Sequence, residues 1–308
     1  MSNQYLVTGA AGFIGSAIAK RLVLLGNSVV TIDNLSTGFI ENIPYGVEFI
    51  EGSVFDENTL LKLGNRRFDA IIHVAGQSSG EISFENPVYD FQTNGQSTLM
   101  LLDYAVKNNC EKFIYASSMS VYGNQCCNEC AESVEPKPLS FYAVGKLASE
   151  NYMRIFSEQY DLVCTSLRLF NTYGIGQNLN NLKQGMVSIY LAMAINEHII
   201  TVKGSKDRFR DFVYIDDVVE AFIMSLKREK GYDFFNVCTG TPITVEKIIS
   251  SISELLPYNI QKQYIEGTKG DQFGIYGSYK KINKILGWNP HVDFQTGLKE
   301  MIEWALDR

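Results

Sequence analysis

The 308-residue sequence lacks several features that define other classes of protein. No apolar stretch approaches the ~18 residues that a membrane-spanning helix needs. Residues 1–4 carry neither a basic segment nor a signal-peptide cleavage site. Lys and Arg total 27 against 34 Asp and Glu, with no basic block, which disfavours binding to nucleic acid or to an anionic membrane. With 45% apolar residues and only seven prolines, the sequence predicts an ordinary globular, cytoplasmic protein.

Histidine and cysteine are also too sparse to indicate a metal centre. The three histidines, His73, His198 and His291, lie far apart, and we assign none of them a catalytic role. The six cysteines show no disulfide framework typical of secreted proteins. Cys126-Cys127-x-x-Cys130 has no second ligand pair at zinc-site spacing, so we expect a thiol-bearing loop and no metal.

Short apolar runs alternate with segments of helical periodicity over the first 125 residues. The runs at 5–7, 28–32, 47–50, 70–74 and 112–116 are continuous apolar stretches, which is typical of strands buried on both faces. Further strands are expected at 163–167 and 234–237, and a final helix at 294–306. The pattern predicts an α/β fold with a Rossmann-like, doubly wound parallel sheet and a smaller C-terminal α/β lobe.

A glycine-rich turn follows the first predicted strand. Gly9, Gly12 and Gly15 are spaced G-x-x-G-x-x-G where the strand passes into a helix. Such glycines let backbone N–H groups approach a pyrophosphate at the helix N-terminus. Asp33 ends the second predicted strand, where a carboxylate accepts hydrogen bonds from ribose hydroxyls and repels a 2′-phosphate. The pattern predicts a dinucleotide site that prefers NAD to NADP.

A second group of residues has the pattern of a catalytic acid–base site. Tyr142 and Lys146 are four residues apart, which places the phenol and the ammonium on one face of a helix. A neighbouring cation stabilises a phenolate, so we expect Lys146 to lower the pKa of Tyr142. Ser117 and Ser118 follow a predicted strand, and open α/β sheets place their sites at such strand ends. A serine there could hydrogen-bond the same substrate oxygen.

Together these motifs resemble the extended short-chain dehydrogenase/reductases, and within them the nucleotide-sugar epimerases related to UDP-glucose 4-epimerase. The resemblance covers nearly the whole chain. It rests on Asn94 and on segments 8–15, 33–38, 73–77, 117–118, 142–146, 168–171 and 208–218. It implies residues 1–171 as an NAD-binding domain, to which 211–240 returns, and 172–308 mainly as a substrate lobe.

The resemblance implies an NAD-dependent enzyme that transiently oxidises C4 of a nucleotide sugar, most simply a UDP-sugar, and returns hydride to the opposite face. Ser118, Tyr142 and Lys146 would be catalytic. The cofactor would contact Gly9, Gly12, Phe13, Ile14, Gly15, Asp33, Asn34, Ser36, Thr37, Gly38, Ser53, Val54, Val74, Ala75, Gly76, Gln77, Asn94, Ser117, Tyr142, Lys146 and Phe170. The substrate would contact Ser118, Met119, Asn171, Gln184, Met186, Arg210 and Asp271.

Departures from the family pattern reduce the number of possible activities but leave alternatives open. The resemblance implies that dehydratases of this family would have Asp-Glu at the positions of Met119 and Ser120, and that decarboxylases would have Glu at the position of Ser120. This chain has neither acid, so both activities are disfavoured. Thr268 stands where the late R-x-G-D motif has its phosphate-binding arginine, which leaves the nucleotide base open. A dehydrogenase or ketoreductase would use the same residues with net redox change, and an NAD-sensing regulator would need only the glycine-rich turn.

The expected quaternary structure also comes from the resemblance. Apolar helical stretches at 95–107 and 144–157 would pair across a two-fold axis in a homodimer. Burial of the same stretches within one chain would give the same periodicity, so the sequence leaves both arrangements open.

Overall fold

The computed structural model describes residues 2–124, 129–182, 184–267 and 273–307. The chain divides into two compact units, and each is described by itself. The first unit comprises Met1–Val121, Pro136–Arg168 and Val219–Phe235, and the second comprises Tyr122–Glu135, Leu169–Val218 and Asn236–Arg308.

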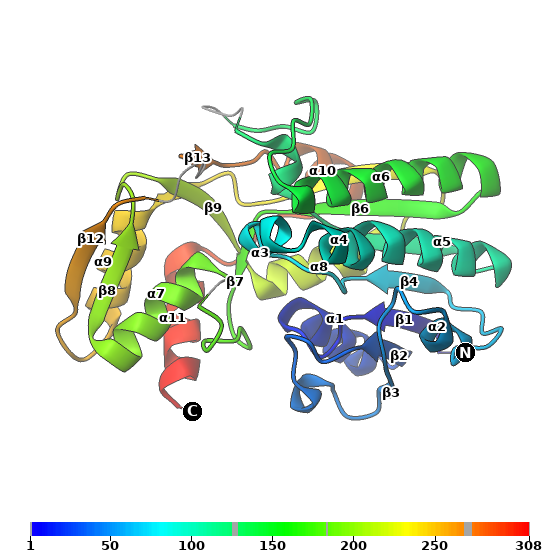
Figure 1. Cartoon of the computed structure of the whole chain (residues 1–308), viewed down its shortest axis with the longest axis horizontal. Helices are drawn as coiled ribbons and strands as arrows, with labels where there is room; N and C mark the ends of the chain where they lie inside the picture. Colours follow the sequence, from blue (N-terminus) through cyan, green and yellow to red (C-terminus); the bar gives the residue numbers. More distant parts are fainter. Residues whose placement is uncertain (1, 125–128, 183, 268–272, 308) are drawn as a thin grey trace. The chain divides into compact units, whose positions relative to one another are not determined.

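A seven-stranded sheet in the order β10-β6-β5-β4-β1-β2-β3 is the centre of the first unit (Figure 1). The ladders that join β3, β2, β1, β4 and β5 are all parallel. This is the Rossmann-like fold that the sequence predicted. The strands are β1 (Gln4–Thr8), β2 (Ser28–Asp33), β3 (Glu48–Glu51), β4 (Ala70–His73), β5 (Lys112–Ser118), β6 (Val163–Leu169) and β10 (Tyr232–Val237).

Helices cover this sheet because its strands carry apolar side chains on both faces. Leu6 of β1 and Phe113 of β5 are fully buried in one cluster with Leu101 and Leu102 of α5. Figure 1 shows α5 and α6 side by side, and both contact β5. The helices of this unit are α1 (Phe13–Leu24), α2 (Glu57–Leu61), α3 (Gly80–Glu85), α4 (Pro87–Phe91), α5 (Ser97–Lys107) and α6 (Phe141–Tyr160), and α8 (Ile215–Ser225) leads into it from the second unit.

One turn of π-helix, η2 (Gln92–Gln96), joins α4 to α5. Such turns occur frequently at functional sites because the extra residue redirects the side chains around it. The three central residues of η2, Thr93, Asn94 and Gly95, are buried. The helix expected to begin near residue 95 therefore begins earlier, at Pro87, with the π-turn inside it.

The second unit contains two small sheets and four helices within its described residues. One sheet has the order β11-β9-β13, with β7 also paired to β9, and the other joins β12 to β8. Three helices pack in series, because α9 contacts both α7 and α11. The elements are β7 (Asn171–Tyr173), α7 (Met186–Glu197), β8 (Ile199–Lys203), β9 (Phe209–Tyr214), β11 (Pro242–Thr244), α9 (Val245–Leu255), β12 (Gln261–Ile265), β13 (Gly274–Ile275), α10 (Lys280–Leu286) and α11 (Phe294–Leu306).

Residues 122–135 belong to the second unit, although the sequence placed them within 1–171. The reason is pairing with distant backbone. The Cys130 N–H donates to the carbonyl of Tyr276, and the Ser278 N–H donates to the carbonyl of Cys130, both at 2.9 Å. Partners nearly 150 residues away in sequence leave no local pattern that could predict this.

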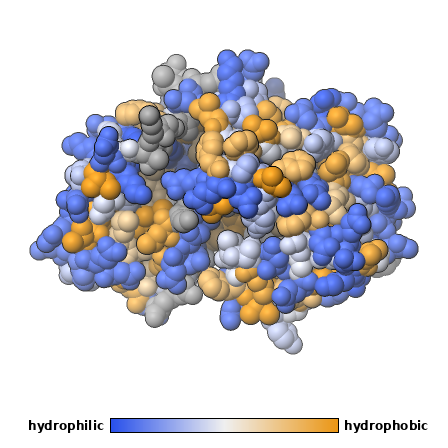
Figure 2. All heavy atoms as spheres, in the orientation of Figure 1, coloured by the Kyte–Doolittle hydropathy of each residue, from blue (hydrophilic) through white to orange (hydrophobic). Residues whose placement is uncertain are grey.

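Large apolar side chains remain exposed on the helices α3 to α6. In Figure 2, hydrophobic residues interrupt the hydrophilic surface in the region that these helices occupy in Figure 1. The exposed apolar side chains of α3 to α6 include Phe84, Val88, Phe91, Leu99, Phe141, Val144 and Ile155. No helix among the described residues is both long and apolar enough to cross a membrane.

Candidate active site

The glycine-rich turn lies at the carboxyl end of β1, and its backbone is tightly packed. The Gly9 N–H donates to the Ile32 carbonyl at 2.9 Å, and Gly9 has φ +80°, which favours glycine. A Cβ on Gly15 would lie 2.1 Å from the Gly9 carbonyl oxygen, so no side chain fits there. Gly12 precedes α1 without a side-chain cap, and Phe13 and Ile14 form its first turn. The N–H groups of this turn therefore suit a pyrophosphate, as the motif predicted.

Asp33 is oriented by the same turn. Its carboxylate accepts hydrogen bonds from the N–H groups of Ala11, at 3.0 Å, and Leu35, at 2.8 Å. The following loop returns to the glycine-rich turn, where the Phe39 N–H donates to the Ala11 carbonyl at 3.0 Å. Beside β3, the Asn34 amide donates to the Ser53 hydroxyl at 3.0 Å. The residues predicted to bind the adenosine half thus lie around one strand end: Asn34, Ser36, Thr37, Gly38, Ser53 and Val54.

A buried histidine connects the glycine-rich turn to α5, a role that we did not predict. The Thr8 hydroxyl accepts from the N–H groups of Val74 and Ala75, so its proton is directed to Nδ1 of His73, 2.8 Å away. His73 Nε2 lies 3.2 Å from the Ser97 hydroxyl, which donates to the Thr93 carbonyl. Each donor and acceptor in this row of hydrogen bonds has a partner when the imidazole is neutral. Burial lowers the pKa of His73 to about 3.

This histidine should make the protein less stable as the pH falls. Between pH 6.5 and 3, His73 takes up a proton in the unfolded chain but not in the folded one, so its contribution to the unfolding free energy falls by about 1.4 kcal/mol per pH unit. On lowering the pH from 7.5 to 5, the wild type should lose about 2 kcal/mol more than His73→Gln in urea unfolding. His291→Gln, which replaces a histidine at an exposed position, is the control and should change this loss much less than His73→Gln does. Equal losses for His73→Gln and the wild type would contradict the assignment.

The segment after β4 approaches the π-turn so closely that glycine is needed there. A Cβ on Gly76 would lie 2.6 Å from the Asn94 side-chain oxygen. The Asn94 amide donates to the Gln77 carbonyl at 2.9 Å, and the Gln77 amide donates to the Asp90 carboxylate at 2.8 Å. The other carboxylate oxygen of Asp90 and the side-chain oxygen of Asn94 are buried without a hydrogen-bond partner.

Asp90 is a member of this cluster that the sequence analysis missed. It is almost fully buried. Burial lowers the pKa of Lys146 and raises that of Tyr142, and the negative charge of Asp90 opposes the first shift and adds to the second. A polar residue within an amphipathic helix has no pattern of its own, so only its position four residues before Asn94 could have identified it.

Ser118, Tyr142 and Lys146 come together at the carboxyl end of β5. The Lys146 ammonium donates to the Ala116 carbonyl at 2.9 Å and lies 5.6 Å from the centre of the Tyr142 ring. Burial lowers the pKa of Lys146 to about 7 and raises that of Tyr142 to about 12, against which the Ser118 hydroxyl lowers the tyrosine pKa. The pKa of Tyr142 is therefore raised, and not lowered as its spacing from Lys146 had predicted, because burial disfavours the charged phenolate.

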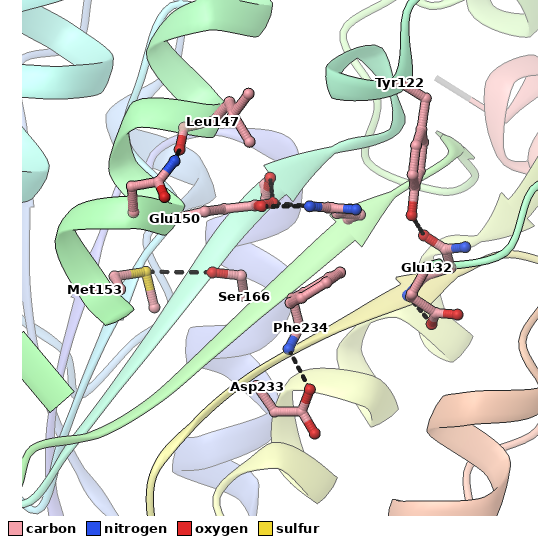
Figure 3. Close-up of polar contacts among 12 residues, drawn as sticks. Tyr122, Glu132, Leu147, Glu150, Met153, Ser166, Asp233 and Phe234 are labelled. Carbon is pink, nitrogen blue, oxygen red and sulfur yellow. Dashed lines mark hydrogen bonds and ion pairs between the residues drawn. The ribbon is translucent and has the colours of Figure 1, made fainter. Parts of the chain in front are cut away.

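Behind these residues lies a buried ion pair. Figure 3 shows Glu150 projecting from α6. In the sequence it follows Lys146 by one helical turn. Its carboxylate accepts from Arg168 Nε at 2.9 Å and Nη2 at 2.6 Å, and from the Ser117 hydroxyl at 2.6 Å. The Glu150 and Arg168 side chains are 4% and 3% exposed, so both charges are withdrawn from water. The pair fixes the end of β5, which carries Ser117 and Ser118, against the helix that carries Tyr142 and Lys146.

Among the described residues predicted to bind the substrate, Ser118 and Met119 lie in the first unit, and Asn171, Gln184, Met186 and Arg210 lie in the second. Asn171 begins β7, and its side-chain oxygen is buried without a hydrogen-bond partner. Met186 begins α7, whose N-terminus has no side-chain cap. Gln184 accepts from the Asn181 amide at 3.1 Å, and Phe170, predicted to contact the cofactor, is buried.

Four positions that the sequence analysis singled out lie outside the described residues: Thr268, Asp271, Cys126 and Cys127. Cys130 is buried as a free thiol. Among the residues that are described, no group of three or more His, Cys, Asp or Glu could hold a metal ion.

Comparison with known proteins gives a consistent result. A model of the NAD dependent epimerase/dehydratase family matches residues 5–238. A putative UDP-glucose 4-epimerase of Methanocaldococcus jannaschii is 31% identical over 300 residues, which is 97% of each chain. The structure is similar to that of Thermotoga maritima UDP-glucose 4-epimerase with UDP-glucose, with a TM-score of 0.94, 33% identity and 99% of each chain covered. It is also similar to the Thermus thermophilus UDP-glucose 4-epimerase complex with NAD, with a TM-score of 0.91, 32% identity and 98% of each chain covered.

Proposed function

Because the chain belongs to the NAD-dependent epimerase/dehydratase family, within the extended short-chain dehydrogenase/reductases, and is an NAD-dependent epimerase, we propose that it interconverts the C4 epimers of a UDP-sugar. One observation carries the proposal. Tyr142, Ser118 and Lys146 meet at the carboxyl end of β5, in the same unit as the glycine-rich turn. A regulatory protein that only sensed NAD would need the glycine-rich turn but not this acid–base group.

The residues around the turn fit NAD. The cradle at Gly9 and Gly15 leaves no room for side chains but presents backbone N–H groups, and the Asp33 carboxylate is held ready for ribose hydroxyls. NAD, when bound, supplies the reversible hydride acceptor for the sugar carbon. The buried oxygens of Asn94 and Asp90 have hydrogen-bonding capacity to spare beside Lys146, where the nicotinamide ribose would bind.

Tyr142 is the proton acceptor in this mechanism. Its phenolate oxygen takes the proton of the C4 hydroxyl as the sugar is oxidised and gives it back when the sugar is reduced on the other face. The Ser118 hydroxyl donates a hydrogen bond to the same sugar oxygen. Lys146 would hold the cofactor ribose, and in its cationic form it would stabilise the phenolate of Tyr142.

Within the second unit, we propose that Arg210 binds the substrate diphosphate, with Asn171, Gln184 and Met186 near the nucleotide. Arg210 is 7% exposed, and its guanidinium donates to the Phe209 carbonyl at 2.8 Å and to the Phe273 carbonyl at 3.3 Å. These contacts hold a buried cation in one orientation, which suits an anionic ligand. Asp271 stays a prediction for the same nucleotide.

We further propose that the enzyme is a homodimer through the helices α3 to α6. Large apolar side chains are exposed on each of these helices, and the Phe84 and Phe141 rings lie edge to face, 5.6 Å apart. Apolar surface of this kind marks protein interfaces. Light scattering should give the mass of two chains, and a mass of one chain at micromolar concentration would contradict the proposal.

The nucleotides that remain bound after purification test the proposed function directly. An epimerase that regenerates its NAD in each cycle has no need to release it. Mass spectrometry of the denatured, otherwise untreated protein should therefore find NAD close to one per chain, with any co-purified sugar nucleotide being a UDP species. Bound NADP would contradict the role of Asp33. Complete absence of dinucleotide would instead favour a dehydrogenase that exchanges its cofactor.

A further inference from the structure

Asp90 is a buried carboxylate that the proposed mechanism does not use. It lies on α4, one helical turn before Asn94, and is 1% exposed. One of its oxygens accepts from the Gln77 amide at 2.8 Å and from the Asn94 amide at 3.3 Å, whereas the other, Oδ2, is buried without a hydrogen-bond partner. Both donors are neutral amides, so they fix the carboxylate without cancelling its charge.

The unpartnered oxygen lies beside the part of α6 that carries Lys146. A Cβ on Gly145, the residue directly before Lys146, would lie 3.6 Å from Asp90 Oδ2. Within the same cluster, the place of a Cβ on Gly76 is 2.6 Å from Asn94 Oδ1 and 3.6 Å from Lys146 Nζ. The helices α4 and α6 contact each other as well. Asp90 and Lys146 therefore belong to one buried cluster, and their charges act on each other.

Lys146 is a buried cation whose charge needs compensation. Its side chain is almost out of contact with water, and its ammonium lies 4.7 Å from the centre of the Tyr115 ring and 5.6 Å from that of Tyr142. Burial lowers the pKa of Lys146 to about 7, although the charges of Asp90 and Glu150 raise it. With a pKa in this range, the surrounding charges decide whether the lysine is cationic near neutral pH.

The phenols and the imidazole around Lys146 do not supply a negative charge. Burial raises the pKa of Tyr115, and raises that of Tyr142 to about 12, so both phenols are neutral near pH 7. Burial and the charge of Lys146 lower the pKa of His73 to about 3, so the imidazole is neutral too. The compensation must therefore come from the carboxylates.

Of the two carboxylates that act on Lys146, Glu150 is already engaged. Two hydrogen bonds from Arg168, at 2.9 and 2.6 Å, compensate its charge. Burial raises the pKa of Asp90, but the Gln77 amide and the charge of Lys146 oppose this, which favours the ionised carboxylate. Asp90 thus has its charge available for Lys146.

Resting on the proposed function, in which cationic Lys146 stabilises the phenolate of Tyr142, we propose that Asp90 is a positioning residue that keeps Lys146 cationic. Asp90 also repels the phenolate itself, so its benefit to the reaction runs through the lysine. Without Asp90, Lys146 would lose its proton at a lower pH, and the cation beside the tyrosine would be lost with it.

The ionisation of Lys146 can be followed by NMR of the NAD-loaded enzyme labelled with ¹³C at the lysine Cε, whose shift reports loss of the ammonium proton. The resonance of Lys146 is the one absent from Lys146→Met. Asp90→Asn, which keeps the shape of the side chain but not its charge, should lower the midpoint of this titration by about one pH unit. Asp103→Asn makes the same change at a position on α5 that is 54% exposed, and should leave the midpoint unchanged.

The pH dependence of turnover gives a second readout. Lys146 loses its proton as the pH rises, so in Asp90→Asn the alkaline limb of the kcat profile should move to lower pH by the same amount as the NMR titration. A residue that served only the packing would lower kcat at every pH and leave this limb in place, and that result would overturn the proposal.

The possible failures are distinguishable. An unchanged Lys146 titration in Asp90→Asn would overturn the role of Asp90 and leave the proposed function standing. If the wild type converts no nucleotide sugar, the proposed function fails, and the role of Asp90 in it fails too. If Asp90→Asn does not fold, the double variant Asp90→Asn/Lys146→Met should fold, because it leaves no lone cation buried. A double variant that also fails to fold would show that Asp90 serves the packing alone.

Discussion

Tyr142→Phe should reduce epimerase turnover by roughly 10²–10⁴-fold, because the substitution removes the group that exchanges a proton with the sugar hydroxyl. The substitution removes only the hydroxyl group, and the aromatic ring stays in place beside Lys146 and Ser118. The glycine-rich turn and Asp33 do not change. The variant should therefore retain the same amount of bound NAD as the wild type, and product formation from UDP-sugars should be followed together with NAD content.

Ser118→Ala is the informative companion to this variant. The serine hydroxyl supports the substrate oxygen but carries no proton in the mechanism, so its loss should cost less turnover than the loss of the phenol. If Tyr142→Phe kept near-wild-type turnover, the acid–base assignment would be wrong. If the variant lost its NAD as well as its activity, the defect would lie in cofactor binding.

Glu150→Ala should lower the free energy of unfolding by about 3–5 kcal/mol, which is the usual cost of removing one partner of a buried ion pair. Arg168 would remain 3% exposed with both of its charge-assisted hydrogen bonds to Glu150 removed. The Ser117 hydroxyl would lose its acceptor too. Urea unfolding followed by circular dichroism measures the effect.

The same helix offers a matched control for this variant. Glu158 pairs with Arg154 at 3.0 Å, but both side chains are about half exposed, at 54% and 46%. Glu158→Ala should therefore cost no more than about 0.5 kcal/mol. The double variant Glu150→Leu/Arg168→Met should recover much of the stability, because no lone charge stays buried. Similar small losses for Glu150→Ala and Glu158→Ala would show that the buried pair contributes no more than an exposed one.

The sequence predicted the parts of the fold that are encoded locally. The run at 5–7 lies in β1, the glycine-rich turn follows it, and Asp33 ends β2, because strand, turn and helix here are consecutive in the chain. Tyr142 and Lys146 lie on α6, as their spacing predicted, and one helical turn brings the two side chains to the same face.

The parts that sequence reasoning missed depend on contacts between distant segments. The role of Asp90 depends on its hydrogen bond from Gln77 and on the charges of α6, which come from distant parts of the sequence. The π-turn after Asp90 has no residue pattern that distinguishes it from an ordinary helix. The pKa of Tyr142 depends on how deeply β5 and α6 bury it, which its spacing from Lys146 does not reveal.

The measurement that tests the central claim most directly is conversion of UDP-glucose and UDP-N-acetylglucosamine in D₂O with no added cofactor, followed by NMR at C4 of the sugar. The account predicts that at least one of them is converted to its C4 epimer and that the C4 hydrogen stays protium, because the hydrogen removed from that carbon is returned to it and does not exchange with solvent. Deuterium at C4, or product only when NAD or NADH is added in stoichiometric amount, would contradict it.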